Sequence, residues 1–144
     1  MSNATRQPSI LLVEDNPVDI DLLRRAFQRR NLSNPLEVAR DGLEALEFLD
    51  RWERGELAPP AVILLDIKLP KVDGLEVLRR IRAHDRFRRI PVVMLTSSSE
   101  DRDIATAYDS GANSYIVKPV DFAKFVDVAE QVELYWCLLN HPPG

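Results

Sequence analysis

The chain of 144 residues is long enough for one domain with a complete hydrophobic core, and its 45% hydrophobic and 29% charged content is ordinary for a globular protein. A net charge of -4 argues against a nucleic-acid-binding protein. The single cysteine, Cys137, excludes an internal disulfide, and no apolar run reaches transmembrane length, so we expect a cytoplasmic protein without membrane contact.

Strand-like and helix-like segments alternate along the chain after a polar N-terminus, residues 1–8, which we expect to be disordered or a tag remnant. Short apolar runs predict strands at 9–13, 62–65, 91–95 and 114–117, and an alternating run predicts a half-exposed strand near a sheet edge at 36–39. Helical spacing of apolar residues predicts helices that begin near Pro17, Gly42, Asp73, Glu100 and Asp121. Five such alternations predict an α/β fold with a parallel sheet covered on both faces.

Polar side chains follow four of the predicted strands, at the point where each strand ends. Glu14 and Asp15 follow the first strand, Asp66 the third, Thr96 the fourth and Lys118 the fifth. Because parallel strands end at the same edge of a sheet, we expect these groups to converge. Three carboxylates repel one another unless a cation intervenes, and an all-oxygen site without His or Cys favours Mg²⁺. A carboxylate in such a site can also act as a nucleophile and form an aspartyl phosphate.

With these residues in place, the chain resembles the receiver domain of two-component response regulators, the CheY-like group. The resemblance covers residues 9–130 and lies in five motifs in the same order. These are Leu12-Val13-Glu14-Asp15-Asn16, Leu64-Leu65-Asp66-Ile67-Lys68-Leu69-Pro70, Asp73-Gly74, Leu95-Thr96-Ser97 and Val117-Lys118-Pro119. It implies a doubly wound, flavodoxin-like fold with a five-stranded parallel sheet in the order 2-1-3-4-5, for which CheY is a standard example.

The resemblance also assigns a phosphoryl-transfer role to the acidic residues. Asp66 corresponds to the phosphoacceptor, which takes a phosphoryl group from a sensor histidine kinase. Glu14 and Asp15 correspond to the acid pair that holds Mg²⁺, with Asp66 and the backbone carbonyl of Lys68 as further ligands. The protein is then no enzyme in the usual sense, since it catalyses only its own phosphorylation and dephosphorylation.

Further residues correspond to the parts of the family that respond to phosphorylation. Lys118 corresponds to the lysine that bonds a phosphoryl oxygen, and Thr96 to the hydroxyl that follows the phosphoryl group. Tyr115 stands at the position of the switch aromatic residue, which turns inward when the hydroxyl moves. Pro119 corresponds to a proline that follows a cis peptide bond. Phosphorylation is expected to change the binding of a downstream protein.

Simpler interpretations exist for each residue. Asp15 could only favour the start of a helix, Lys118 could be a solvated lysine at a strand end, and Tyr115 could be a core residue. An enzyme on a similar sheet is disfavoured: no P-loop motif occurs, which argues against an NTPase, and Lys68, not an acid, stands two residues after Asp66, which argues against a phosphatase. A phosphorylation-independent adaptor remains as an alternative, and it predicts that Asp66→Asn leaves partner binding intact.

The C-terminal residues 131–144 are expected to extend the last helix and to end in a tail. Val128, Tyr135 and Leu138 broaden the apolar face of that helix, which predicts a homodimer or partner interface there. With the connector at 54–60, this tail resembles single-domain regulators that partner bacterial phytochromes. The segment is too short to be a DNA-binding domain, so we expect no DNA binding. The arginines between positions 79 and 89 are expected to form a solvated face.

Overall fold

The computed structural model describes residues 8–118 and 121–140, with backbone alone for 135–140. Five parallel strands form one sheet in the order β2-β1-β3-β4-β5. The strands are β1 (Ile10–Val13), β2 (Leu36–Ala39), β3 (Val62–Leu65), β4 (Val92–Thr96) and β5 (Ser114–Val117). The helices between and after them are α1 (Pro17–Arg29), α2 (Gly42–Glu53), α3 (Gly74–Ala83), α4 (Asp101–Asp109) and α5 (Phe122–Asn140). The predicted class and strand order are both confirmed.

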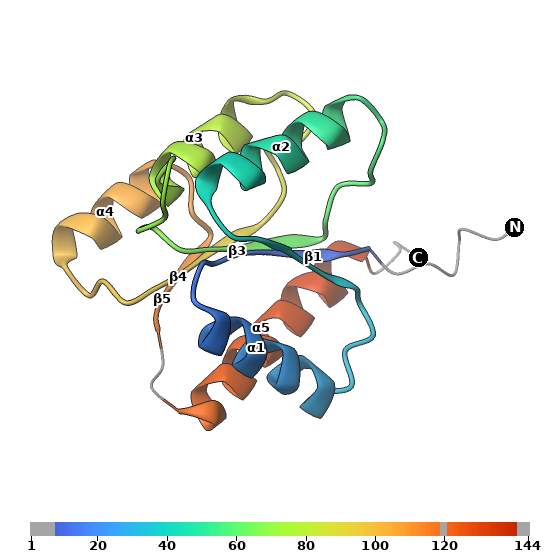
Figure 1. Cartoon of the computed structure of the whole chain (residues 1–144), viewed down its shortest axis with the longest axis vertical. Helices are drawn as coiled ribbons and strands as arrows, with labels where there is room; N and C mark the ends of the chain where they lie inside the picture. Colours follow the sequence, from blue (N-terminus) through green and yellow to red (C-terminus); the bar gives the residue numbers. More distant parts are fainter. Residues whose placement is uncertain (1–7, 119–120, 141–144) are drawn as a thin grey trace, which may run out of the picture.

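Helices cover both faces of the sheet, with α2, α3 and α4 on one face and α1 and α5 on the other (Figure 1). Alternate residues of each central strand point to opposite faces, so β1 and β3 contribute to two separate cores. Trp52 of α2 packs in the core that contains Ile63 and Leu65, whereas Phe125 of α5 packs in the core that contains Leu64. This burial on both faces explains why the central strands read as continuous apolar runs.

The two edge strands are less buried than the central ones. Strand β2 lies at one edge of the sheet and only its last residue, Ala39, is fully buried, as its alternating sequence predicts. Among the residues that the structure describes, no helix is long and apolar enough to cross a membrane.

Two expectations about exposed side chains are wrong. Val128 is 2% exposed and packs in the core beneath α5, so it does not broaden an outer apolar face. Arg82 does not belong to a solvated face, since it lies half-buried between α3 and the segments that lead into β4 and β5. The side chains of Tyr135, Trp136 and Leu138, and Pro119 with its predicted cis bond, lie outside the described residues.

Arg82 joins three segments through hydrogen bonds to backbone and side-chain oxygens. Its guanidinium donates to the carbonyls of Ile90 at 2.7 Å, Gly111 at 2.9 Å and Arg88 at 3.1 Å, and to Asn113 Oδ1 at 2.8 Å. A planar guanidinium offers five donors in a fixed geometry, which the single ammonium of lysine cannot reproduce. Arg82 therefore acts as a structural residue.

We predict that Arg82→Lys lowers the free energy of unfolding by about 1–3 kcal/mol, because several carbonyl oxygens lose their donors. Urea denaturation measures the change. Arg80→Lys is the matched control, since Arg80 is exposed and only pairs with Glu76 at 2.9 Å, and its cost should stay within about 0.5 kcal/mol. Equal effects of the two substitutions would contradict the structural role of Arg82.

Candidate active site

The carboxyl ends of β1 and β3 bring three acidic side chains together. Val13 lies opposite Leu65 in the parallel register, so the residues that follow these strands are neighbours. One carboxylate oxygen from each of Glu14, Asp15 and Asp66 lies within 4.8 Å of the other two. The predicted convergence of these acids at one sheet edge is therefore observed.

Burial distinguishes the three acids. Glu14 is 1% exposed and Asp66 is 6% exposed, whereas Asp15 is open to solvent. Glu14 accepts a hydrogen bond from the backbone N–H of Asn16 at 3.1 Å. Burial raises the pKa of Glu14 above its ordinary value, although the contacts with Lys118 and Asn16 act in the opposite direction. Such a site gains from an additional cation, and its oxygen ligands are those that Mg²⁺ and similar divalent ions prefer.

Lys118 lies at the centre of the cluster. Its ammonium group is 2.7 Å from Glu14 Oε1 and 3.1 Å from Asp66 Oδ2. Burial alone would lower the pKa of Lys118, but hydrogen bonds to Asp19 and Glu14 and the charge of Asp66 hold it well above the ordinary lysine value. Lys118 is therefore positively charged and already lies beside Asp66, the carboxylate that it is expected to assist.

Asp19 is a third carboxylate on the same ammonium, and the sequence analysis did not identify it. Its Oδ2 atom lies 2.8 Å from Lys118 Nζ. Asp19 stands in the first turn of α1, where Asn16 caps the helix by accepting from the N–H groups of Val18 and Asp19. An acid in the first turn of a helix is common, so the sequence alone carries no signal of a role for Asp19 at the site.

The backbone around Asp66 fixes the direction of its side chain. A Cβ atom at Gly74 would lie 1.9 Å from the carbonyl oxygen of Asp66, so only glycine can start α3 this close to the site. The Gly74 N–H also donates to the carbonyl of Ile67 at 2.7 Å, and the Lys68 N–H donates to Asp66 Oδ1 at 3.3 Å. The tight turn after β3 thus holds Asp66 toward Glu14 and Lys118.

Thr96 and Tyr115 lie on the two neighbouring strands next to these acids. Thr96 is fully buried at the end of β4, and its hydroxyl accepts from the N–H of Ser98 at 3.4 Å. Tyr115 is half-buried, and its hydroxyl donates to the carbonyl of Ser98 at 2.7 Å. Burial raises the pKa of Tyr115, so this hydroxyl keeps its proton. Ser98 in turn donates from Oγ to Asp103 at 2.5 Å, which links the loop before α4 to that helix.

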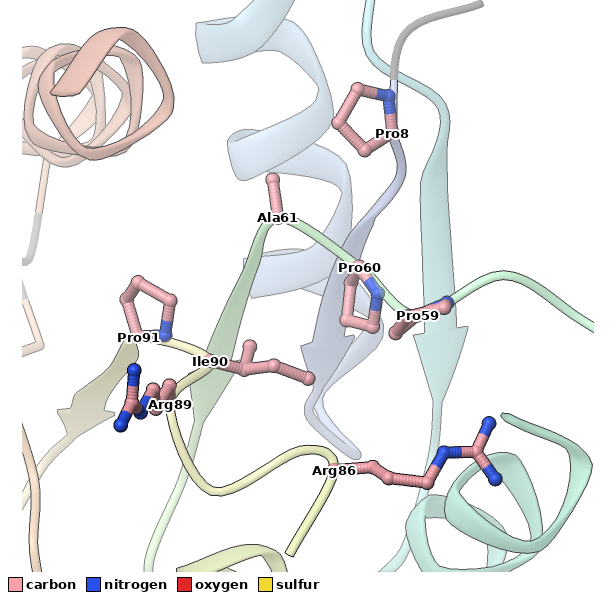
Figure 2. Close-up of a pocket in the computed structure, with 8 residues that line it drawn as sticks. All are labelled: Pro8, Pro59, Pro60, Ala61, Arg86, Arg89, Ile90 and Pro91. Atoms are coloured by element: carbon pink, nitrogen blue, oxygen red, sulfur yellow. The ribbon is translucent and has the colours of Figure 1, made fainter. Parts of the chain in front are cut away.

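A cavity at the opposite end of the sheet has a different character. Its volume is about 320 Å³. Residues that precede the strands line it: Pro8, Pro59, Pro60, Ala61, Arg86, Arg89, Ile90 and Pro91 (Figure 2). Because none of the converging acids borders this cavity, we place the chemistry of the protein at the carboxyl edge.

The profile of the response regulator receiver domain matches residues 10–130. The chain belongs to the response regulator receiver family. Receiver domains are signalling proteins.

Several similar proteins match almost the whole chain. The probable methanogenesis regulatory protein FilR2 of Methanothrix harundinacea is 44% identical over 94% of this chain and 87% of its own length. Response regulator Rcp1 of Synechocystis is 36% identical over 94% of both chains, and the crystal structure of its Mn²⁺-bound form matches with a TM-score of 0.81 over 95% of this chain and 99% of the other. The phosphorylated cyanobacterial phytochrome response regulator RcpA matches with a TM-score of 0.82 at 36% identity, over 95% and 97% of the two chains.

These comparisons place the chain among regulators of two-component systems and close to regulators of the phytochrome-associated type. The acidic cluster is also consistent with the structure of the similar protein Rcp1, which was crystallised in a Mn²⁺-bound form.

We predict that Tyr115→Phe loosens the loop between β4 and α4, because the Ser98 carbonyl loses its only described side-chain donor. One hydrogen bond contributes about 0.5–1.5 kcal/mol, so amide hydrogen exchange in residues 97–100 should accelerate about two- to tenfold. Tyr108→Phe is the control, because Tyr108 is 48% exposed on α4. Unchanged exchange in the Tyr115 variant would show that this contact does not hold the loop.

Proposed function

We propose that this protein accepts a phosphoryl group on Asp66 from the phosphohistidine of a sensor histidine kinase, and that phosphorylation alters its binding to another protein. The observation that supports the proposal best is the position of Asp66, a buried carboxylate between an acid pair and a fixed ammonium. A carboxylate oxygen of Asp66 attacks phosphorus, and the imidazole nitrogen of the kinase leaves as the P–N bond breaks.

Residues around Asp66 would stabilise the negative charge of the phosphoryl group during its transfer. Lys118 donates hydrogen bonds to a phosphoryl oxygen once Asp66 Oδ2 has lost its negative charge. Glu14, Asp15, Asp66 and the carbonyl of Lys68 would hold Mg²⁺, which neutralises phosphoryl oxygens when bound. Mg²⁺ is favoured because the side-chain donors are all carboxylate oxygens.

A conformational switch would follow at the neighbouring strands. The hydroxyl of Thr96 moves toward the phosphoryl group, and Tyr115 turns further inward as space beside β4 changes. The bond from Tyr115 to the Ser98 carbonyl supports this coupling, since it ties the ring to the loop that leaves Thr96. Pro119, one residue after Lys118, would fix the backbone that presents the lysine. The change alters the population of two states of the binding surface.

The proposed kinase partner is inferred from the similar proteins described above. The kinase is proposed to be a bacterial phytochrome, because similar regulators carry that description. The downstream target is a protein, and the reaction takes place in the cytoplasm, where the kinase and a chain with one cysteine meet a reducing environment.

We predict that acetyl phosphate with Mg²⁺ adds one phosphoryl group to the intact chain, detected by mass spectrometry, and that hydroxylamine removes it. A chelator should abolish the addition, because charge at the acidic cluster is then not neutralised. Asp66→Asn should also abolish it, whereas Asp85→Asn, an exposed residue far from the site, should leave it unchanged. A folded protein that gains no group, or gains it in Asp66→Asn, would contradict the proposal and favour the adaptor.

We also propose that the chain forms a homodimer through the end of α5. Helix α5 continues to Asn140, and among its side chains that the structure describes, Val132 is the last in the core at 1% exposed, whereas Leu134, two residues later, is 59% exposed. A helix that extends beyond its own core with apolar residues is typical of an interface.

Truncation after Leu134 should convert this dimer to a monomer in sedimentation velocity, because the removed residues form the interface. This cut keeps Val132 in the core and Glu133 paired with Arg30 at 2.8 Å, so the domain itself should remain folded. Persistence of the dimer after truncation, or a monomeric full chain, would exclude the proposed interface.

A further inference from the structure

The ammonium of Lys118 contacts three carboxylates, of which only Glu14 and Asp66 belong to the acidic cluster. The third, Asp19, comes from helix α1 and lies at 2.8 Å. We propose that Asp19 is a positioning residue that shares the ammonium of Lys118 and so weakens its hold on Glu14 and Asp66, which lets these two carboxylates bind a divalent cation. This inference rests on the proposed function, because it concerns the metal site that Asp66 phosphorylation requires.

Asp19 is built into this position by the start of α1. Asn16 caps the helix, and its side chain accepts from the Asp19 N–H at 3.4 Å, while the next residue, Ile20, is buried in the core. The Asp19 side chain is only 16% exposed, so solvent does not fully screen its contact with Lys118. A favourable effect on the helix dipole explains an acid in this turn, but does not explain its pairing with the lysine that follows β5.

Lys118 and a cation compete for the same oxygens. The ammonium lies 2.7 Å from Glu14 Oε1 and donates a hydrogen bond to Asp66 Oδ2 at 3.1 Å. A cation that binds these carboxylates shares them with the ammonium and is repelled by its positive charge. Asp19 offsets that charge, and it gives the ammonium a partner outside the cluster of Glu14, Asp15 and Asp66.

Removing the charge of Asp19 therefore has two effects, and both lower the affinity of the site for a cation. The ammonium turns more fully to Glu14 and Asp66, and its positive charge is no longer compensated. Both effects need Lys118, which separates this role from a direct contact between Asp19 and the cation. Groups that orient or compensate the neighbours of a metal site typically change metal affinity about 10- to 100-fold.

The test is Mn²⁺ binding to the unphosphorylated full chain, measured from the electron paramagnetic resonance signal of free Mn²⁺. Asp19→Asn should weaken binding about tenfold. Asp21→Asn is the matched control, since it removes the same charge from α1 but faces Arg25 at 3.0 Å on the exposed side, and it should change binding less than about twofold. Thermal melting checks folding, and Asp19→Ser serves as a second variant with a residue suited to a first helical turn.

The same substitution is then made in a Lys118→Met background, where the competing ammonium is absent. We expect Asp19→Asn to lose its effect there. An equal loss of affinity in both backgrounds would overturn the proposal, because Asp19 would then act on the cation directly. No loss in the presence of Lys118 would overturn it as well. A wild-type chain that binds no Mn²⁺ overturns the proposed metal site and this role with it, so the two failures are distinguishable.

Discussion

The ion pairs of Lys118 are the interaction on which the active site depends. Lys118 contacts Glu14, Asp19 and Asp66, and Asp15 lies beside two of these acids, so four carboxylates and one ammonium leave a formal excess of three negative charges. Two like charges 4 Å apart repel by about 4 kcal/mol at the effective dielectric constant of a partly buried site. Without the ammonium, burial of Glu14 would favour its protonation, because burial already raises its pKa. The contact with Lys118 therefore opposes the protonation of Glu14, and the remaining excess of negative charge favours a divalent cation.

The fold makes this concentration of charge possible by fixing the backbone beneath it. Strands β1 and β3 are buried on both faces, so the positions of Glu14 and Asp66 follow from the register of two rigid central strands. Gly74 lets α3 begin against the carbonyl of Asp66, and Asn16 starts α1 so that Asp19 faces the sheet edge. The unfavourable electrostatics of the site are thus offset by two apolar cores that lie below it.

The sequence predicts the strands, the helices and the residues at strand ends because each has a local pattern. Apolar runs, alternation and capping residues such as Asn16 and Asp121 are visible without any tertiary information. Asp19 and Arg82 could not be recognised in this way. An acid in the first turn of a helix has the same sequence pattern whether it faces solvent or pairs with a distant lysine. The partners of Arg82 are mostly backbone carbonyls, which every residue type carries, so the sequence does not reveal them.

The exposed fraction of Val128 also could not be read from the sequence. Helical periodicity identifies an apolar stripe on α5, but the stripe is wide enough to be divided in several ways between the sheet and solvent. The structure assigns Val128 to the core together with Phe125 and Val132, and leaves Leu134 outside. Among the described side chains of α5, the outer surface therefore begins after Val132, and not at the point where the helix becomes unusually apolar.

Helix α4 is the element that a change at the site can displace at the lowest cost. It buries a single residue, Ala107, whereas α1 buries Ile20, Leu23, Ala26 and Phe27. Helix α4 is joined to the site by polar contacts, in which Ser98 bonds Asp103 and accepts from Tyr115. Elements with few buried apolar contacts open with small free energies, so α4 is held to the rest of the domain less firmly than α1. The weak apolar pattern of residues 100–109 thus reflects a helix that buries one residue and is joined to the end of β4 by polar contacts.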